Sequence, residues 1–385
     1  MTRCTSARVD LTALAQNFRV IGSYLQAEAS LNRGAGRGPV RPPGIIAVVK
    51  ANAYGHGARP VAKTLEAAGA TMLAVADIEE GVDLRASGIL APVLVFGALS
   101  VSDVDGVFDY DLTPTIASPA AGAALQAAAA ARGATLRYHL KIDTGMHRLG
   151  FRHDNLRRTL PALLSSANLS LDAVHTHFGT ADEPGHALFD EQRTRFDAAC
   201  RVLDDLGAGP HLRHAANSAA LLRDSRVWYD YVRPGLLLYG LVPPPLGSTL
   251  ALAPVMSLTS RVVAVKGVRT GELVGYGGRF AADRAVTLAV IPAGYADGLD
   301  RRLEGKGAVL IRGRRAPIVG AVSMDMLTAD VTDIDAVGPG DEVVFLGSQG
   351  PAPEQTIDAR EMAAWIGTIP YEILCRLGAR VERTY

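Results

Sequence analysis

The chain has 385 residues, 48% of them hydrophobic, and its 39 basic side chains balance 39 acidic ones. This length exceeds the usual limit for a single hydrophobic core, so two domains are expected. The interspersed charges lack the concentrated positive field that nucleic acids and anionic membranes attract, which leaves small-molecule chemistry as the favoured class of function.

Between about residues 10 and 240, amphipathic helical segments alternate with short apolar runs, as in repeated βα units. The alanine-rich segment Ala120 to Ala131 is predicted to be one of the helices. The glycine- and proline-rich segment Ser30–Pro43 predicts a mobile surface loop. The expected strands are Ile45–Lys50, Met72–Ala76, Val93–Phe96, Leu112–Ile116, Leu136–Ile142, Leu171–His177, Leu212–Ala215 and Tyr229–Arg233. Eight such units predict a closed (β/α)8 barrel of the TIM type, and the lack of a G-x-G-x-x-G motif after any strand argues against a dinucleotide-binding sheet.

After Gly240 the pattern changes to short alternating runs punctuated by glycines, which predicts a mainly-β domain behind a proline-rich linker. The expected strands are Ser260–Val265, Ala285–Ile291, Ala308–Ile311 and Glu342–Leu346, followed by a helix at Asp358–Ile366 and a short C-terminal strand. We therefore expect a barrel domain at residues 11–240 and a β domain at 246–385, with residues 1–10 joining the β domain.

The three cysteines, Cys4, Cys200 and Cys375, are far apart and lack C-x-x-C spacing. This argues against a disulfide framework or a structural zinc site, and no metal is predicted. The N-terminus lacks the apolar region of a signal peptide, and no run reaches the roughly 18 apolar residues of a membrane span. A cytoplasmic location is expected.

Lys50 is the most informative residue, because it ends an apolar strand and is followed by a polar turn containing glycines. In a barrel, the carboxyl ends of the strands converge on one mouth. An ammonium group at this boundary must be paired, neutralised or used covalently as an imine. From this run alone, a catalytic Schiff-base lysine and a buried ion pair both remain open.

Four later strand ends carry further reactive residues. Arg148 follows the fifth strand, His177 ends the sixth, Ser218 follows the seventh, and Arg233 ends the eighth with Gly235 close behind. Backbone N–H groups at Ser218 and in the turn of Gly235 and Leu236 can bind a phosphate, while a histidine and an arginine suit an aromatic ring. The set predicts a site for an anionic aromatic ligand.

Nine motifs in order make the chain resemble the alanine racemases, which are pyridoxal 5′-phosphate enzymes whose barrel is followed by a β domain. The resemblance covers nearly the whole chain. The motifs are VVKANAYGHG (48–57), KIDTGMHRLG (141–150), HFGTAD (177–182), NS (217–218), RPG (233–235), GYG (275–277), GYADG (294–298), SMD (323–325) and IPYE (369–372).

The resemblance implies two catalytic bases. Lys50 would hold the cofactor as an internal aldimine and move the substrate α-proton on one face, and Tyr276 would act on the opposite face. Racemisation needs the second base because a single rigid base returns the proton to the side from which it came. A tyrosine near its usual pKa of about 10 is a poor base, so a polarised neighbour must lower that pKa, and His177 oriented by Arg233 is the candidate.

The resemblance also implies the cofactor contacts. Arg233 would donate to the pyridine nitrogen and, because it can only donate, would make the ring a weaker electron sink. Transamination and elimination would then be discouraged. The remaining cofactor-binding positions would be Tyr54, His177, Asn217, Ser218, Gly235, Leu236 and Tyr371, most of them around the phosphate.

For the substrate carboxylate, the resemblance points to Arg148 and the backbone N–H of Met324. Lys141 aligns with a lysine that is carbamylated in some members, and the new negative charge would hold Arg148 in place. An unmodified lysine with a chloride ion beside it would solve the same electrostatic problem, so both remain open. Asp182 and Asp325 are expected to be structural, and Tyr295 and Arg301 are expected to line the substrate entrance.

The implied activity is the interconversion of L- and D-alanine, supplying D-alanine for peptidoglycan. In the family, Tyr276 and Met324 come from the partner subunit, so a homodimer with composite sites is expected. One alternative is a racemase of broader specificity, acting for instance on serine, since a methylene discriminates by only about 1–3 kcal/mol. Related decarboxylases would need a cysteine in the place of Tyr276, and Cys375 lies in a different context. Non-catalytic pyridoxal-phosphate-binding proteins lack the second domain.

Two departures from the family pattern stand out. One is the Ser30–Pro43 insertion, and the other is Glu382, where a proline is expected. Neither involves an expected site residue.

Overall fold

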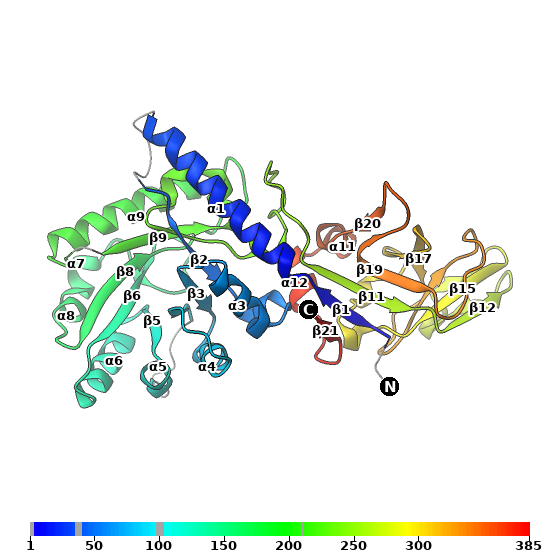
Figure 1. Ribbon diagram of the computed structural model, residues 1–385, viewed down its shortest axis with the longest axis horizontal. Coiled ribbons are helices and arrows are strands. Elements are labelled where there is room, and N and C mark those ends of the chain that lie inside the picture. The colour runs from blue at the N-terminus through cyan, green and yellow to red at the C-terminus, as the bar shows by residue number, and fades with distance from the viewer. Residues whose placement is uncertain (1–3, 35–40, 98–103, 210) are drawn as a thin grey trace. The chain divides into compact units, whose positions relative to one another are not determined.

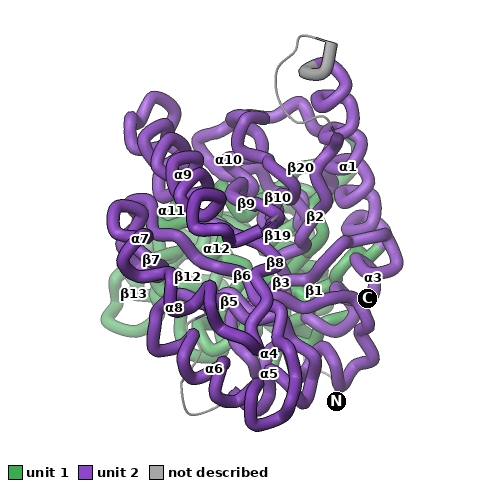
Figure 2. Tube along the Cα trace, turned by 90° about the vertical axis from the view of Figure 1, so that its left-hand side faces the viewer, with its two compact units in different colours: residues 1–11, 54–57, 254–385 green, residues 12–53, 58–253 purple. Residues whose placement is uncertain are grey.

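The computed structural model describes residues 4–34, 41–97, 104–209 and 211–385, and the chain divides into two compact units (Figure 2). The barrel unit comprises Thr12–Ala53 and Ala58–Ala253. The β unit comprises Met1–Leu11, Tyr54–Gly57 and Pro254–Tyr385. The domain bounds expected from the sequence stay a prediction about how the chain divides into folding units.

Eight parallel strands close the barrel. Figure 1 shows part of this barrel with helices around it. In order, the strands are β2 (Gly44–Val48), β3 (Met72–Val75), β4 (Val93–Val95), β5 (Leu112–Ile116), β6 (Leu136–Asp143), β8 (Leu169–His175), β9 (Leu212–Asn217) and β10 (Tyr231–Arg233). Pairing of β5 with β6 and of β10 with β2 completes the ring. Each expected strand overlaps one observed strand, so the predicted barrel is confirmed. The apolar runs are buried, as expected of parallel strands covered on both faces.

Helices follow most of the strands. The main ones are α1 (Leu11–Gly34), α3 (Ala58–Ala67), α4 (Ile78–Ala86), α5 (Asp105–Asp109), α6 (Pro119–Ala131), α9 (Leu188–Asp205) and α10 (Ser218–Arg223). Shorter elements of the unit are β7 (Phe151–Arg152), α7 (Leu156–Thr159), α8 (Pro161–Leu164), η1 (Ser225–Val227) and η2 (Leu236–Tyr239). The predicted alanine-rich helix is α6, and the Ser118 side chain caps it by accepting the N–H of Ala121 at 3.2 Å.

The predicted loop at Ser30–Pro43 is partly wrong. Helix α1 continues through Gly34, because no proline interrupts it and neither Ser30 nor Leu31 ends a helix. Residues 35–40 of the expected loop lie outside the described residues. Within the described part of the chain, no helix combines the length and apolar character needed to cross a bilayer.

The β unit confirms the expected mainly-β architecture. Its main sheet has the strand order β12-β15-β18-β17-β16-β19-β11-β1-β21, with β20 paired to β19 and a separate pair β13-β14. The strands are β1 (Ser6–Val9), β11 (Met256–Arg261), β12 (Ala264–Val268), β13 (Leu273–Val274), β14 (Phe280–Ala281), β15 (Val286–Ile291), β16 (Ala308–Ile311), β17 (Arg314–Val319), β18 (Leu327–Asp330), β19 (Glu342–Gln349), β20 (Gln355–Ile357) and β21 (Glu382–Thr384).

The N-terminal strand β1 joins this sheet, antiparallel to β11 and parallel to β21. Helices α11 (Ala359–Ile366) and α12 (Pro370–Cys375) and the 3₁₀ turns η3 (Tyr276–Gly278), η4 (Tyr295–Asp297) and η5 (Arg301–Leu303) complete the unit. The expected single strand Ser260–Val265 is wrong, because the chain changes partners there. The Val262 N–H donates to Asp341 O, and the Val263 N–H donates to Val290 O, both at 2.9 Å.

Candidate active site

The reactive residues of the barrel lie on adjacent strands. Lys50 follows β2, Arg233 ends β10, Ser218 follows β9 and His177 follows β8, and these four strands are consecutive in the ring. Because all are parallel, their carboxyl ends lie at one mouth of the barrel. Burial lowers the pKa of His177 well below its usual value, and the positive charges of Lys141, Arg233, Arg148 and Lys50 lower it further. The neutral form of His177 is therefore favoured.

The turn after Lys50, α2 (Lys50–Tyr54), is left-handed. Ala51, Asn52, Ala53 and Tyr54 all have φ between 52 and 54°. Non-glycine residues pay about 1–2 kcal/mol each for this conformation, so neighbouring contacts must hold it. The sequence predicts a turn here but does not reveal its hand.

Two side-chain contacts hold this left-handed turn. The Glu80 Oε1 atom accepts the Ala51 N–H at 2.6 Å, and Asn52 Oδ1 accepts the Ala58 N–H at 2.8 Å. The second oxygen of Glu80 accepts the Ala76 N–H at 2.8 Å, which ties the turn to the end of β3. Glu80 is thus a residue near the site that the sequence analysis missed.

Arg233 is buried inside the barrel with its guanidinium held at several points. Its Nη1 lies 2.9 Å from His214 Nδ1, and its Nη2 donates to the carbonyls of Thr176 and Ala215 at 2.8 Å and lies 3.3 Å from His177 Nδ1. Burial lowers the pKa of Arg233 to about 9, so the group still carries its charge at neutral pH. Each terminal nitrogen bears two hydrogens, and the contact with His214 uses only one of those on Nη1. The second hydrogen of Nη1 and the Nε–H make no hydrogen bond to a described residue, so either can donate to a ring acceptor.

Ser218 and the turn after β10 lie together. The Ser218 hydroxyl oxygen accepts the Gly235 N–H at 2.9 Å and the Leu237 N–H at 3.4 Å, so the loops that follow β9 and β10 meet. Asn217 caps α10, with its Oδ1 accepting the Ala220 N–H at 2.9 Å. Helix α10 begins at Ser218. A hydroxyl and clustered backbone N–H groups can hold a phosphate, and this part of the cofactor set therefore fits.

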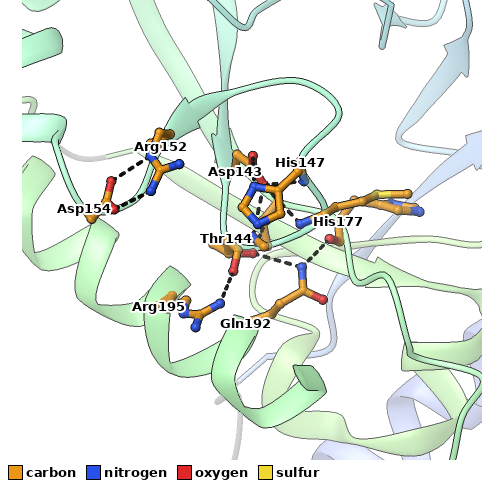
Figure 3. Close-up of polar contacts among 11 residues, drawn as sticks. Asp143, Thr144, His147, Arg152, Asp154, His177, Gln192 and Arg195 are labelled. Carbon is orange, nitrogen blue, oxygen red and sulfur yellow. Dashed lines mark hydrogen bonds and ion pairs between the residues drawn. The ribbon is translucent and has the colours of Figure 1, made fainter. Parts of the chain in front are cut away.

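Lys141 lies on β6 among other cations. Burial lowers its pKa well below the usual value, the positive charges of Arg233 and Arg148 lower it further, and Asp143 opposes them. The carboxylate of Asp143 is engaged by the following loop, since its Oδ1 accepts the N–H groups of Gly145, Met146 and His147 at 3.0, 3.1 and 3.1 Å (Figure 3). The cluster thus favours an additional anion near Lys141.

Gln192 on α9 links two of the strand-end loops (Figure 3). Its Nε2 donates to His177 O at 2.9 Å and to Thr144 Oγ1 at 3.2 Å, and its Oε1 accepts the Gly179 N–H at 2.9 Å. Sequence reasoning missed this fully buried amide, because a glutamine in an amphipathic helix usually faces solvent. Gln192 positions the backbone that carries His177.

The β unit contains a pair of neighbouring tyrosines. Tyr54 is buried, and its ring centroid lies 5.9 Å from that of Tyr371. Burial raises the pKa of Tyr54, and the nearby Tyr371 and Cys375 raise it further, so its hydroxyl keeps its proton and can donate. Arg383 Nε donates to Gly55 O at 2.6 Å, which ties the C-terminal segment to the segment that carries Tyr54.

Tyr276 and Met324 are exposed on the β unit, at 76% and 52% of their surface. Tyr276 lies between Gly275 and Gly277, both with φ of 74°, a left-handed conformation that glycine adopts readily. Met324 O accepts from Arg380 Nη2 at 3.0 Å, and Arg380 also contacts Asp297 and Asp325. Arg380 is a second residue that sequence reasoning missed, and Asp325 supports the loop as its partner.

The remaining expected residues differ in their surroundings. Tyr295 and Arg301 are exposed on the β unit, and Asp182 is exposed on the barrel unit. Glu382, where the family pattern suggests a proline, lies in β21 with Ser6 of β1 as its partner, so it takes part in the sheet.

The closed barrel carries a lysine just after β2, a buried arginine at the end of β10, and the Ser218 hydroxyl between the loops that follow β9 and β10. Together these features define the class of protein as an enzyme that uses a phosphate-bearing aromatic cofactor. Comparisons with known proteins are more specific. Residues 9–243 match the family profile described as alanine racemase, N-terminal domain, and residues 255–385 match that of the C-terminal domain. The chain belongs to the alanine racemase family.

Relatives cover the chain from end to end. It is 43% identical to an alanine racemase of Carboxydothermus hydrogenoformans over 98% of both chains, and 39% identical to one of Halothermothrix orenii over 100% of this chain and 97% of the relative. The solved alanine racemase of Streptomyces lavendulae is similar with a TM-score of 0.91 at 34% identity, covering 100% of this chain and 97% of that one. The Bacillus anthracis enzyme with bound L-Ala-P has a TM-score of 0.88 at 35% identity, covering 100% and 95%. The predicted family, the isomerase class and pyridoxal phosphate dependence are confirmed.

Proposed function

We propose that the protein interconverts L- and D-alanine with pyridoxal 5′-phosphate and supplies D-alanine for peptidoglycan. The observation that carries the proposal is the set of residues at four consecutive strand ends, with Lys50, Arg233, Ser218 and His177 at one mouth. When bound, the cofactor withdraws electrons from the bond between the substrate Cα and its hydrogen. The protein then has to bind, orient and move a proton.

Proton transfer is assigned to two residues. Lys50 Nζ takes and returns the Cα proton on one face of the substrate, and Tyr276 Oη does so on the other. Two opposed bases are required because a single rigid base would return the proton to the face it left. His177, kept neutral among cations, is the proposed partner that polarises the Tyr276 hydroxyl.

Arg233 is assigned to the ring nitrogen of the cofactor. A guanidinium only donates, so the ring nitrogen stays unprotonated and withdraws electrons less strongly. Side reactions that need a long-lived carbanion are thereby disfavoured. The several contacts that hold the guanidinium, and the N–H groups of Arg233 that make no hydrogen bond to a described residue, support this assignment.

The phosphate is assigned to hydroxyl and backbone donors. Tyr54 and Tyr371 supply hydroxyls, and Ser218 supplies a third. Gly235 and Leu236 supply backbone N–H groups. Asn217 is assigned a supporting part, because its side chain caps the helix that begins at Ser218.

The substrate carboxylate is assigned to Arg148 and to the backbone N–H of Met324. We infer that the cations around Lys141 require an anion, either a carbamate on Lys141 or a bound chloride. Incubation with ¹³C-labelled bicarbonate followed by ¹³C NMR of the native protein distinguishes them, because only a carbamate gives a labelled signal. Absence of that signal together with activity independent of chloride would contradict the inference.

We propose a homodimer in which Tyr276 and Met324 serve the partner's site. Their exposure, with that of Tyr295 and Met326 at 44% and 49%, supports a surface that a second copy covers. A cytoplasmic location is proposed because the three cysteines are far apart in the sequence and lack the spacing of a disulfide framework, which suits a reducing compartment.

A mixing experiment tests the composite sites. Lys50→Ala and Tyr276→Phe each inactivate the protein, but equal amounts refolded together should recover about a quarter of wild-type activity, because about half of randomly paired dimers carry one intact site of two. No recovery, with mixed dimers present, would place both bases in one chain. The wild-type dimer itself is checked by light scattering.

Chiral analysis after separate incubation with L-alanine and L-serine tests the activity directly. The proposal expects D-alanine as the main product, and it fails if the cofactor-loaded protein racemises neither amino acid. Rapid racemisation of serine would instead favour the broader enzyme. Lys50→Ala should also lose the visible absorbance of the lysine-bound cofactor.

A further inference from the structure

The loop that follows β6 folds around the side chain at the end of that strand. Asp143 is the last residue of β6 and is 9% exposed. Its Oδ1 atom accepts the backbone N–H groups of Gly145, Met146 and His147 at 3.0, 3.1 and 3.1 Å (Figure 3). Three successive N–H groups thus converge on one buried carboxylate oxygen. The proposed function assigns no role to Asp143.

The far end of the loop returns to the same residue. The Asp143 carbonyl oxygen accepts the His153 N–H at 3.1 Å, and β7 pairs with the last two residues of β6. A methyl group on Gly150 would lie 2.7 Å from Asp143 N, so only glycine allows the chain to come this close. We name residues 144–152 the Asp143 loop. Its first half is held by the carboxylate of Asp143, and its second half is held by the backbone.

His147 shows that the carboxylate contacts hold an unfavourable conformation. Its φ is 56°, a left-handed value that a residue with a side chain keeps only when its surroundings hold it. The His147 Nδ1 atom lies 3.4 Å from Asp143 Oδ2, but the ring is 69% exposed and solvent screens this ion pair. The backbone N–H contacts with Asp143 are therefore the interactions that keep the turn in place.

Helix α9 fixes the base of the Asp143 loop. The Arg195 Nη1 atom donates to Thr144 O at 3.0 Å, and the Gln192 Nε2 atom donates to Thr144 Oγ1 at 3.2 Å. The hydroxyl oxygens of Thr144 and Thr176 lie 2.7 Å apart, which joins the loop to the segment after β8. Because the base is fixed, the path of the following residues depends on the contacts that Asp143 makes with them.

Arg148 follows directly after the three N–H groups that Asp143 accepts. The proposed function assigns the substrate carboxylate to this residue. Burial lowers the pKa values of Lys141 and His177, and the charges of neighbouring cations, Arg148 among them, lower both further. The guanidinium of Arg148 is thus close enough to act on the residues at the barrel mouth. An arginine side chain is long and flexible, so the position of its backbone limits which carboxylate it can reach.

We propose that Asp143 is a positioning residue, whose carboxylate fixes the backbone of the Asp143 loop and thereby presents Arg148 to the carboxylate of the amino-acid substrate. The inference rests on the role proposed for Arg148. Asp143 could also act through its charge, because it opposes the fall in the pKa of Lys141. Two substitutions at Asp143 separate the backbone contacts from the charge.

The test compares Asp143→Ala with Asp143→Asn in the full-length, cofactor-loaded protein. Alanine removes both the acceptor and the charge, whereas asparagine keeps an amide oxygen that can accept the three N–H groups. Met146 and His147 are exposed, so water can reach the N–H groups that alanine releases, and the variant is expected to fold. Circular dichroism checks the fold.

Asp154→Ala is the matched control. Asp154 lies just beyond the Asp143 loop and pairs with Arg152, at 46% and 59% exposure (Figure 3). The N–H groups at 145–147 donate to Asp143, so the control removes an aspartate beside the loop without changing its contacts with Asp143.

We expect Asp143→Ala to raise KM for alanine about 10- to 100-fold, as for loss of a charge-assisted contact, while kcat falls by less than about threefold. This split is expected because substrate and transition state carry the same carboxylate. Asp143→Asn and Asp154→Ala should keep KM within about threefold of the wild-type value. Amide hydrogen exchange at 145–147, measured by NMR without cofactor, should be at least about tenfold faster in the alanine variant alone.

Arg148→Met supplies a further readout that a merely structural role would not move. If Asp143 acts through Arg148, adding Asp143→Ala to Arg148→Met should raise KM by less than about twofold more, because the positioned group is already absent. A general loss of structure would instead add its full effect to that of Arg148→Met.

An unchanged KM in the folded alanine variant would overturn the proposal, and so would full additivity with Arg148→Met. An asparagine variant as impaired as the alanine variant would also overturn it, since the charge rather than the backbone contacts would then matter. If the wild-type protein racemises no amino acid, the dissociation constant of propionate, measured by calorimetry, replaces KM. Propionate binding that weakens 10- to 100-fold only in the alanine variant would then support the role of Asp143 while the proposed function fails. A wild-type protein that binds no propionate would overturn both.

Discussion

Replacing Ala51 by glycine is expected to stabilise the protein, although the same change destabilises most helical positions. Ala51 has φ of 54° and ψ of 52° in the left-handed turn after Lys50, and its methyl group is exposed. Relief of the strain in the left-handed conformation raises the free energy of unfolding by about 1–2 kcal/mol. The greater freedom of glycine in the unfolded chain lowers it by about 0.4–1 kcal/mol. The net stabilisation is roughly 0 to 1.5 kcal/mol.

Ala127→Gly is the matched control. Ala127 is also exposed, but it lies in the middle of the right-handed helix α6, where glycine costs about 0.5–1 kcal/mol. Urea unfolding of both cofactor-free variants, followed by circular dichroism at two protein concentrations, measures the difference. Equal destabilisation by the two glycines would refute the reasoning, because it would mean that position 51 carries no conformational strain.

Activity should move in the opposite direction to stability at Ala51. The left-handed turn holds the backbone of Lys50, so added freedom there lowers kcat while the folded state gains stability. A fall in kcat that accompanies a rise in the unfolding midpoint cannot come from general unfolding. Ala127→Gly should leave kcat unchanged.

Three further outcomes are expected. Gln192→Leu should remove the hydrogen bonds of the buried amide with Thr144 Oγ1, His177 O and the Gly179 N–H, and destabilise the protein by about 1–3 kcal/mol in urea unfolding. An unchanged midpoint would contradict the bridging role. Arg380→Lys removes the guanidinium contacts with Met324 O and Asp297, and it should raise KM for alanine about tenfold in steady-state assays. Arg261→Lys is the surface control. An unchanged KM in the Arg380 variant would contradict this prediction. The unfolding free energy should fall as pH drops below about 6.5, because the unfolded chain binds protons that the buried histidines exclude, and His175→Phe should reduce this slope by up to about 1.4 kcal/mol per pH unit in urea titrations between pH 5 and 8. A slope unaffected by that substitution would show that His175 already binds its proton in the folded state. The histidines with lowered pKa are His139, His153, His175, His177 and His214.

Much of the barrel and its mouth is predictable from local patterns. Apolar runs mark the strands, and a reactive residue at the end of a run, such as Lys50 or Arg233, marks the mouth because parallel strands end at one edge. The prediction of one strand at Ser260–Val265 was wrong. Its residues suit a strand at every position, but the chain pairs with one strand up to Arg261 and with another from Ala264, which local patterns do not show.

Three buried histidines inside the barrel illustrate what local patterns cannot reveal. His139, His175 and His214 are separated by more than thirty residues along the chain, and each lies in an apolar run that predicts only a buried strand. Closure of the ring brings them together, and the pairing of His175 with His214 sets their level. The sequence offered one signal: three of the expected buried strands each carry a histidine, and fully buried histidines are uncommon.

The sequence by itself determined the barrel, the β unit and the family, because these depend on periodicity and on motifs that lie within short stretches. Only the tertiary structure decided the left-handed turn after Lys50, which Glu80 and Asn52 hold through hydrogen bonds, and the contacts that hold the Arg233 guanidinium inside the barrel. The reason is physical. The handedness of a turn and the contacts of a buried side chain depend on the partners that each group meets in other strands, and those partners are in place only once the ring has closed.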